Sequence, residues 1–286
     1  MARLLFGTSI DRRYVLVRAI GQGGVSTVYA AVDAADGRER AVKILGSGSD
    51  ARREAVLTDR LRHPSVPRVF AYGQAPLPDG TVAPYLVLEL LRGRPLTERL
   101  TGGPLPWRSA ARIAAATADV LAVAHRRGVA HRDLSARNVM LTPTGPKIID
   151  FGLARPVDSP GPATDGSGRV GPVDWPDPVA DGFGRTRLGD WPGPVADDVY
   201  TLGVLLYEMV TGRSPYPPAV AATIRVAGRT AHLAPTPVLA VPGLPSRLRD
   251  LVRDCMAKTP RLRPTAREAA RDLWSLLDTP KTAPLA

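Results

Sequence analysis

Cysteine, aromatic residues and long apolar runs are all scarce in this sequence of 286 residues. The single cysteine, Cys255, cannot form an internal disulfide, and its apolar neighbours predict a small buried residue in a protein of the reducing cytoplasm. No run of about 18 or more apolar residues occurs, so we expect no membrane span in this chain. Residues 1–6 are too few and too poorly arranged to predict a secretory signal.

Aromatic residues make up only 5% of the chain and are not interleaved with the basic residues. This scarcity matters because the formal net charge is +11, and such an excess of positive charge can indicate a nucleic-acid partner. Since the basic residues are scattered, we expect no nucleic-acid partner. The charge instead indicates a solvated surface that attracts small anions and acidic protein segments. Hydrophobic residues at 44% are typical of a soluble globular protein.

Apolar spacing predicts strands in the first third of the chain and helices in most of the rest. Residues 52–61 have helical spacing, which Pro64 ends, and they lie among several short apolar runs. The predicted strands cover residues 14–20, 28–32, 40–45, 66–72 and 85–90. The later predicted helices cover residues 107–128, 199–210, 247–256 and 266–277. This order predicts an α+β protein with a small sheet, one helix beside it, and a larger helical part.

One segment fits neither pattern. Residues 155–194 are rich in Gly, Pro and Asp, and residues 174–181 and 190–197 contain a near-repeat of Asp-Trp-Pro-x-Pro-Val-Ala-Asp. A connection of this length inside a compact domain is usually functional or mobile. Local duplication is the simplest explanation of the repeat.

The most informative stretch is His-Arg-Asp at residues 131–133, followed by Asn138 and by Asp-Phe-Gly at residues 150–152. Phosphoryl transfer from ATP needs a carboxylate near the acceptor hydroxyl and two oxygen ligands that hold Mg²⁺ against the phosphates. Asp133 has the chemistry for the first task, and Asn138 and Asp150 have it for the second. The two tripeptides in this order are far more specific than either alone.

Together these motifs resemble those of eukaryotic-like (Hanks-type) protein kinases of the bacterial kind, a serine/threonine kinase family. The resemblance extends from about Tyr14 to Leu277. It implies a bilobal kinase fold, with a small N-terminal lobe of one antiparallel β-sheet and one helix and a larger, mainly helical C-terminal lobe. The expected bounds are 10–280 for the domain, 10–91 and 92–280 for its lobes, and 1–9 and 281–286 for short tails. ATP and Mg²⁺ are the implied cofactors.

The resemblance assigns the phosphates of ATP to a glycine loop and a lysine. Residues 21–28 lie between two predicted strands, where glycine lets the backbone approach phosphates closely. Ser26 stands where the family has a third glycine, and Gly24 would partly compensate. Lys43 interrupts an apolar strand, and a buried ammonium needs anions nearby. In the family these anions are phosphates and a helix glutamate, here Glu54; alternatively, Glu54 is an ordinary solvated helix residue.

Residues 85–91 resemble the strand and hinge that hold adenine in the family. Backbone groups of Glu89 and Leu91 would bond the adenine edge, with Leu88 at the back of the pocket and apolar side chains on both faces. The expected ATP-binding residues are Ile20, Gly21, Gln22, Gly23, Gly24, Val28, Ala41, Lys43, Leu88, Glu89, Leu91 and Met140. Each apolar member could equally be an ordinary core residue.

Other residues take catalytic or structural roles by the same resemblance. Asp133 would orient the substrate hydroxyl and accept its proton, while His131 would pack beneath the loop. Arg132 would meet an anion such as a phosphate on the activation segment, Asp198 would brace the loop backbone, and Arg263 would be a buried structural cation. The catalytic set is Asp133, Arg137, Lys43 and Glu54. Autophosphorylation within residues 155–190 is possible, at Ser159, Thr164, Ser167 or Thr186.

Two departures from the family leave the acceptor hydroxyl open. Serine/threonine kinases usually have lysine two places after the catalytic aspartate, where this chain has Ser135. Arg137 takes the position that tyrosine kinases use for the same electrostatic task. Pro172 and Trp175 in the acceptor-binding loop are also in the tyrosine-kinase style. The general style of the sequence nevertheless favours serine or threonine.

A third departure concerns the end of the acceptor-binding loop. Val179 replaces the glutamate that normally pairs with Arg263, and a buried cation without a partner is costly. Asp177 or Asp181 could substitute, or the second Trp-Pro repeat could supply the loop. Otherwise the activation segment would be loosened.

The sequence therefore predicts an active ATP-dependent protein kinase. The alternative is a catalytically weak or inactive pseudokinase that serves as a nucleotide-binding signalling scaffold. Ser26 and Val179 favour this alternative, and the complete catalytic and metal-binding set opposes it. A small-molecule kinase is a third interpretation, opposed by the glycine loop and by the motifs around Asp198 and Arg263. The protein substrate and oligomeric state stay open, and the chain is either a free-standing enzyme or part of a larger protein.

Overall fold

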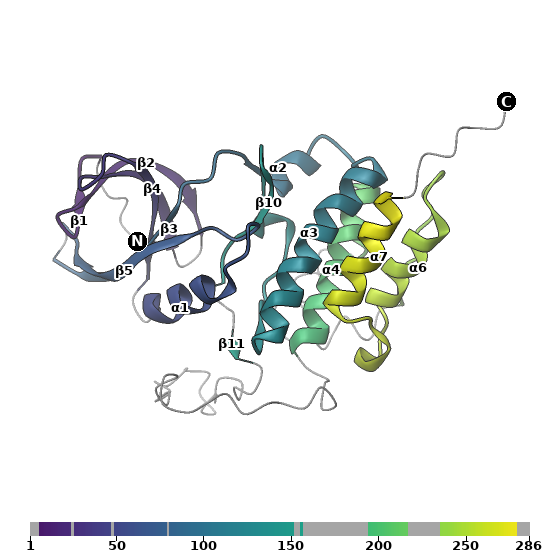
Figure 1. Cartoon of the computed structure of the whole chain (residues 1–286). Coiled ribbons are helices and arrows are strands. Elements are labelled where there is room, and N and C mark those ends of the chain that lie inside the picture. Colours follow the sequence, from purple (N-terminus) through teal and green to yellow (C-terminus); the bar gives the residue numbers. More distant parts are fainter. Residues whose placement is uncertain are drawn as a thin grey trace.

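Six antiparallel strands form the sheet of the N-terminal lobe, in the spatial order β1-β2-β3-β4-β6-β5 (Figure 1). They are β1 (Ser9–Ile10), β2 (Tyr14–Gln22), β3 (Ser26–Asp33), β4 (Glu39–Leu45), β5 (Val69–Pro76) and β6 (Val82–Glu89). The computed structural model describes residues 6–23, 26–46, 49–78, 80–151, 155–156, 194–216 and 235–278.

The central strand β4 sends its side chains to two different environments, because successive residues of a strand point to opposite faces. Val42 and Ile44 are buried in the larger apolar core of the sheet. Leu45 belongs to a second, smaller core, which it shares with α1 (Ala51–Leu61). Lys43 has the same parity as Leu45, so the pleat directs its ammonium to the α1 side of the sheet.

Asp50 caps the N-terminus of α1, and its side chain accepts a hydrogen bond from the backbone N–H of Arg53 at 2.9 Å. An acceptor at this position satisfies one of the free amides of the first turn and fixes where the helix starts. Ala55 packs against Leu86 of β6 in the smaller core. The helix ends at Leu61, and Arg62, which caps it, has a left-handed φ of 40°. A short connector, residues 62–68, then leads to β5.

Helices dominate the C-terminal lobe (Figure 1). They are α2 (Leu96–Leu100), α3 (Trp107–Arg126), α4 (Pro194–Thr211), α6 (Ser246–Cys255) and α7 (Ala266–Asp278), with the 3-10 turns η1 (Ala136–Asn138) and η3 (Pro260–Leu262). Short strands pair in the order β10-β9-β7 and as β11-β8. Their bounds are β7 (Arg94–Pro95), β8 (Val129–Ala130), β9 (Val139–Thr142), β10 (Gly145–Ile148) and β11 (Arg155–Pro156).

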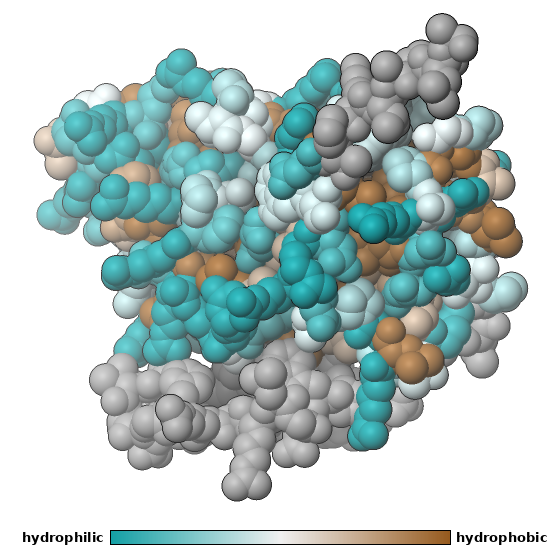
Figure 2. Space-filling model, turned by 45° about the vertical axis from the view of Figure 1, so that its right-hand side comes forward, coloured by the Kyte–Doolittle hydropathy of each residue, from teal (hydrophilic) through white to brown (hydrophobic). Residues whose placement is uncertain are grey.

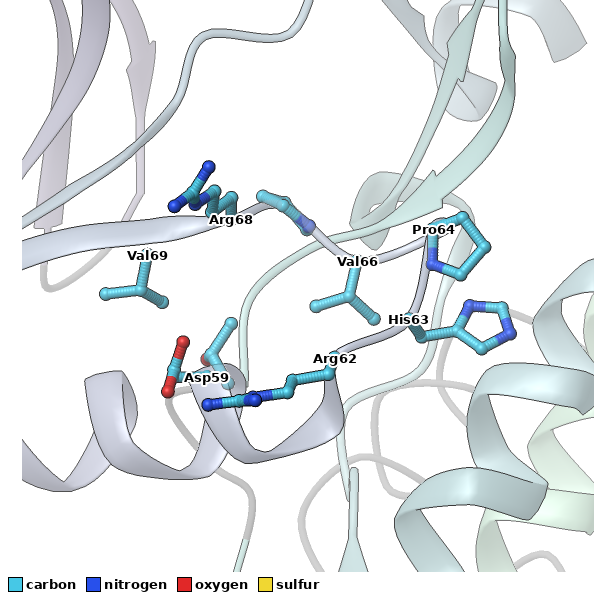
Figure 3. Close-up of a pocket in the computed structure, with 9 residues that line it drawn as sticks. Asp59, Arg62, His63, Pro64, Val66, Arg68 and Val69 are labelled. Atoms are coloured by element: carbon cyan, nitrogen blue, oxygen red, sulfur yellow. The ribbon is translucent and has the colours of Figure 1, made fainter.

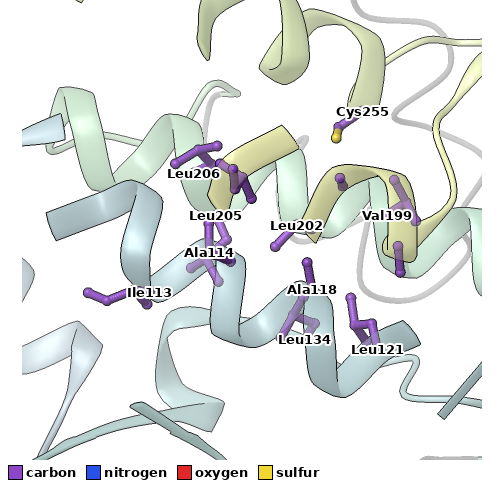
Figure 4. Close-up of a cluster of buried hydrophobic side chains, with 14 of the residues drawn as sticks. Ile113, Ala114, Ala118, Leu121, Leu134, Val199, Leu202, Leu205, Leu206 and Cys255 are labelled. Atoms are coloured by element: carbon purple, nitrogen blue, oxygen red, sulfur yellow. The ribbon is translucent and has the colours of Figure 1, made fainter. Parts of the chain in front are cut away.

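Helix α3 lies at the centre of this lobe and packs against α4 and α7. Small side chains such as Ala114 and Ala118 on α3 let the neighbouring helices approach closely, and Leu202 and Leu205 of α4 lie in the same cluster (Figure 4). Cys255 is also in the cluster, 1% exposed, and burial raises the pKa of its thiol to about 12. The expectation of a small core residue at this position is therefore confirmed.

The architecture agrees with the sequence prediction of a small sheet with one helix followed by a helical part. The strand predicted over residues 66–72 begins only at Val69, however. Val66 instead lies in the connector, where Pro64 and Pro67 interrupt strand pairing, and it is buried in the core of the C-terminal lobe. The very short strands β1, β7, β8 and β11 were not predicted, because a strand of two residues is too short to show an alternation of apolar and polar side chains.

The face shown in Figure 2 is covered mainly by hydrophilic side chains, with apolar residues in separated patches. No helix in the described part of the chain is long and apolar enough to cross a membrane.

The close packing of α4 on α6 gives a test of this fold. A Cβ atom on Gly203 would lie 2.8 Å from both Cys255 Cβ and Met256 Cγ, which is too short for packed carbon atoms. We expect Gly203→Ala to lower the free energy of unfolding by about 1–3 kcal/mol, although alanine is the better helix former by about 1 kcal/mol. Urea unfolding measures this change. Gly102→Ala is the control, since its nearest atoms would be 3.6 Å away; an equal loss in both variants would contradict the packing.

Candidate active site

Two carboxylates from different parts of the chain meet at the ammonium of Lys43. Lys43 Nζ lies 2.7 Å from Glu54 Oε1 of α1 and 2.8 Å from Asp150 Oδ1, which follows β10 in the C-terminal lobe. Lys43 and Glu54 are 6% and 7% exposed. The structure thus joins the sheet, the helix and the second lobe through one cation, and Glu54 is not a solvated helix residue.

The charges of this cluster support one another. Burial by itself lowers the pKa of Lys43, but the fields of Glu54 and Asp150 and the hydrogen bonds to both outweigh it, so the pKa lies above its usual value. Burial raises the pKa of Glu54, against the opposing field of Lys43. A buried ion pair is strongly destabilising when only one partner is removed. Lys43 therefore remains a fixed positive charge at the junction of the lobes.

The second group of candidate residues lies in the loop before β9. Asn138 Nδ2 donates to the backbone oxygen of Asp133 at 2.8 Å and to its Oδ2 at 3.0 Å. These two bonds fix the orientation of the amide, so that Asn138 Oδ1 is the atom left to accept a ligand. The backbone N–H of Ile149 donates to Asn138 O at 2.9 Å, which ties this loop to the residue before Asp150.

Asn138 and Asp150 suit a divalent cation of the Mg²⁺ type. An amide oxygen and a carboxylate are hard oxygen ligands, and Mg²⁺ is usually held by one or two carboxylates while water and phosphates complete its shell. Groups of three or more His, Cys, Asp or Glu side chains that could enclose a metal are absent from the described residues. The donor set therefore fits a metal that arrives with a phosphate ligand better than a metal held by protein alone.

Two residues of the site hold unfavourable backbone angles. Arg132 has φ 65° and Asp150 has φ 66°, in the left-handed region that residues with a Cβ rarely adopt. Such angles persist only where neighbouring contacts enforce them. Asp198 supplies contacts for the first, because its Oδ1 accepts the backbone N–H of Arg132 and its Oδ2 that of His131, both at 2.8 Å.

Asp198 is also linked to α3, since His125 Nε2 lies 2.9 Å from its Oδ2. Asp198 is 1% exposed, so these bonds are shielded from water. His131 is fully buried, and its ring packs on Phe151 with 4.6 Å between the ring centroids. Burial lowers the pKa of His131. The histidine is therefore a neutral packing residue between the two sequence motifs.

Arg263 finds a carboxylate that the sequence interpretation missed. Its Nη1 donates to Asp197 Oδ1 at 3.0 Å and to Ala196 O at 2.8 Å, and its Nε donates to Ala257 O at 2.9 Å. The guanidinium also lies over the ring of Tyr200, 4.9 Å from its centroid. The partner is thus the first of two adjacent aspartates at the start of α4. This pair of adjacent aspartates is the sequence feature from which the partner of Arg263 could have been predicted.

Most of the expected ATP-binding residues lie on adjacent strands. Val28 pairs with both Gly21 and Lys43 across β2, β3 and β4, and Ala41 pairs with Leu88 of β6. Ile20 and Gln22 lie at the end of β2, and Gly23 follows it. Glu89 ends β6 and Leu91 comes shortly after, whereas Met140 lies on β9 in the other lobe. Arg137 is exposed on η1.

Several predicted residues cannot be compared with the structure. Those outside the described residues are Gly24, Ser159, Thr164, Ser167, Pro172, Trp175, Asp177, Val179, Asp181 and Thr186.

A separate cavity of about 510 Å³ lies between α1 and β5, where Val66 and Val69 point toward Asp59 and Arg62 (Figure 3). None of the residues that line it belongs to the expected ATP-binding set.

Comparisons with known proteins find a matching family profile and several similar proteins. The family profile described as Protein kinase domain matches residues 14–275. Over 267 residues the chain is 36% identical to Serine/threonine-protein kinase PknA of Mycobacterium tuberculosis, with 90% of this chain and 59% of PknA covered. Over 217 residues it is 36% identical to Probable serine/threonine-protein kinase PknB of Corynebacterium glutamicum, with 72% of this chain and 32% of that protein covered. The chain thus spans less than two thirds of either relative.

A solved structure shows the same fold. The crystal structure of a mutant Mycobacterium tuberculosis PknI kinase domain matches with a TM-score of 0.66, over 96% of this chain and 99% of that chain. The sequence identity is 23%, so this likeness concerns the fold alone. It confirms the predicted bilobal α+β architecture.

The hydrogen bonds of Asp198 predict a measurable loss of stability. Asp198→Asn replaces an acceptor oxygen by an NH₂ group and leaves a buried backbone N–H without its partner, so the free energy of unfolding should fall by about 2–4 kcal/mol. Chemical unfolding measures this. Asp250→Asn is the control, because Asp250 is half exposed and forms a surface ion pair with Arg253, so its loss should cost less than about 0.5 kcal/mol. Equal losses in the two variants would show that Asp198 does not brace the loop.

Proposed function

The chain belongs to the protein kinase family, and from that premise we propose that it transfers the γ-phosphate of ATP to a protein hydroxyl, chiefly of serine or threonine. The observation that carries this proposal is the meeting of Lys43 with Glu54 and Asp150 across the two lobes. A cation held in this way is placed to bind the phosphates of a nucleotide. The proposed domain covers residues 10–280, with lobes at 10–91 and 92–280.

Each side chain of the site receives one task in this proposal. Asn138 and Asp150 hold Mg²⁺, which neutralises charge on the phosphates when it is bound. Lys43 orients the α- and β-phosphates, and Glu54 keeps the lysine in place. Asp133 orients the acceptor hydroxyl and accepts its proton; its carboxylate is held by Asn138. Arg137, four residues after Asp133 and exposed on η1, supplies positive charge to the transferring group.

Serine or threonine is the proposed acceptor because the relatives are named serine/threonine-protein kinases. A tyrosine acceptor is the second candidate. It is favoured by the absence of a lysine two residues after Asp133, where the hydroxyl of Ser135 is buried and makes no hydrogen bond within the described residues. We further propose autophosphorylation within residues 155–190 and a cytoplasmic site of action, where ATP is available.

A pseudokinase is disfavoured by the contacts of the site. All the groups that phosphoryl transfer requires are present, and Lys43, Glu54 and Asp150 are bonded to one another. The replacement of a glutamate by Val179 does not leave Arg263 without a carboxylate, because Asp197 lies 3.0 Å from it. The main sequence argument for inactivity is thereby removed.

The first test is transfer of labelled γ-phosphate in the presence of Mg²⁺. The unaltered protein should become labelled or should label a basic carrier protein. Lys43→Met and Asp150→Asn should each lower the rate by about 100-fold or more, because each removes a charge that acts on the phosphates in the transition state. Asp250→Asn, on a distant exposed surface, should keep the rate of the unaltered protein. Retained transfer in Asp150→Asn would remove Asp150 as a metal ligand.

The second test identifies the acceptor. Acid hydrolysis of the labelled protein, followed by separation of phosphoamino acids, should yield phosphoserine or phosphothreonine. Phosphotyrosine as the sole product would overturn the proposed specificity while leaving the proposed transfer intact.

A further inference from the structure

The carboxylate of Glu89, at the end of β6, links this strand to the connector and to β10. Lys147 Nζ, on β10 of the C-terminal lobe, lies 2.9 Å from both Glu89 Oε1 and Oε2. The backbone N–H of Arg68, at the end of the connector, donates to Oε2 at 3.2 Å. The Lys147 side chain is only 12% exposed, and that of Glu89 is 36% exposed. The pair is therefore partly shielded from water and from salt.

Backbone hydrogen bonds surround this ion pair. Glu89 N donates to Arg68 O at 2.8 Å, so the hinge is tied to the connector. Ile148 N donates to Ser65 O at 2.7 Å, so the residue after Lys147 is tied to the same connector. The connector, the end of β6 and β10 thus form one junction, with the Lys147–Glu89 pair as its only ion pair among the described residues.

Each of the three segments at the junction leads to a different part of the site. The connector follows α1, which carries Glu54, and β10 leads within two residues of Ile148 to Asp150. The end of β6 carries the backbone of Glu89 itself, which is expected to face adenine. A shift at the junction would consequently move the carboxylates of the Lys43 cluster and the adenine segment relative to one another.

We propose that Lys147 and Glu89 are a positioning pair, which sets the relative placement of the hinge, the connector and β10 and thereby the affinity for nucleotide. The inference rests on the proposed function, because it concerns the same nucleotide site. Lys147 touches no reacting atom and acts through Glu89.

The fold has other ties at the junction, so loss of the pair should not unfold the protein. The two backbone hydrogen bonds remain in any side-chain variant. The connector is also held at its other end by Arg127, whose Nη1 donates to the carbonyl oxygens of Arg60 and Leu61 at the end of α1. A change in nucleotide affinity without loss of the fold is therefore the signature of a positioning pair.

The experiment is a charge-reversal cycle with Mg²⁺-ADP as the probe. Lys147→Glu and Glu89→Lys should each raise the dissociation constant, measured by titration calorimetry, by roughly threefold to tenfold. The double variant, which restores an ion pair of opposite orientation, should return it to within about twofold of the unaltered protein. Lys147→Arg should keep the affinity, and Lys147→Met gives a second variant without reversed charge.

A matched ion pair provides the control. Arg92 Nη2 lies 2.9 Å from Glu39 Oε2 just beyond the hinge, but these side chains are 84% and 57% exposed. Arg92→Glu should therefore leave the dissociation constant unchanged.

Unchanged ADP affinity in the single variants would overturn the inference. A double variant whose loss of binding free energy equals the sum of the losses in the two single variants would also overturn it. So would a lowered unfolding temperature with unchanged affinity, which a merely structural pair predicts. Failure of the unaltered protein to bind Mg²⁺-ADP would overturn the proposed function instead, which separates the two failures.

Discussion

The buried ammonium of Lys43 is the constraint on which the arrangement of the two lobes depends. A positive charge that is 6% exposed needs anions in fixed positions, and the described residues supply them from Glu54 and Asp150. Glu54 reaches it only because Asp50 starts α1 at the right residue and because alanines of α1 pack closely on the sheet. Asp150 follows β10 by two residues, and it reaches the ammonium from a backbone held at a left-handed φ of 66°. One charge thus requires the strand, the helix and the second lobe to converge.

In the C-terminal lobe, a buried carboxylate holds the loop that carries the catalytic candidates. Asp198, on the central helix α4, accepts the amides of His131 and Arg132 and so holds the loop that carries Asp133. The adjacent Asp197 pairs with Arg263, which fastens the start of α4 to the turn after α6. Neighbouring aspartates on one helix therefore perform two separate tasks. Helix α3 packs against α4 and α7, which places both aspartates at the edge of one apolar core.

Much of this could be predicted from the sequence, because the decisive groups stand in short motifs or follow a clear period. The lysine in an apolar strand, read with the family resemblance, predicted Glu54 as its partner, and the helices followed from their apolar spacing. The ion pair of Lys43 with Asp150 was not predicted, because Asp150 was expected to be a metal ligand. The partner of Arg263 was not predicted, because Asp197 lies 66 residues away and only the fold selects it over other aspartates. The Lys147–Glu89 pair was missed for the same reason, since no local pattern relates residues 58 apart. Val66 was wrongly assigned to a strand, because its apolar side chain fits a strand and a buried connector equally well.

The most direct measurement of the central claim is a crystal structure of the protein with Mg²⁺ and a non-hydrolysable ATP analogue. The account predicts that the analogue lies between the lobes, with Lys43 on its phosphates and with the metal between Asn138 and Asp150. An analogue bound elsewhere, or a Lys43 ammonium that faces away from the phosphates, would contradict it.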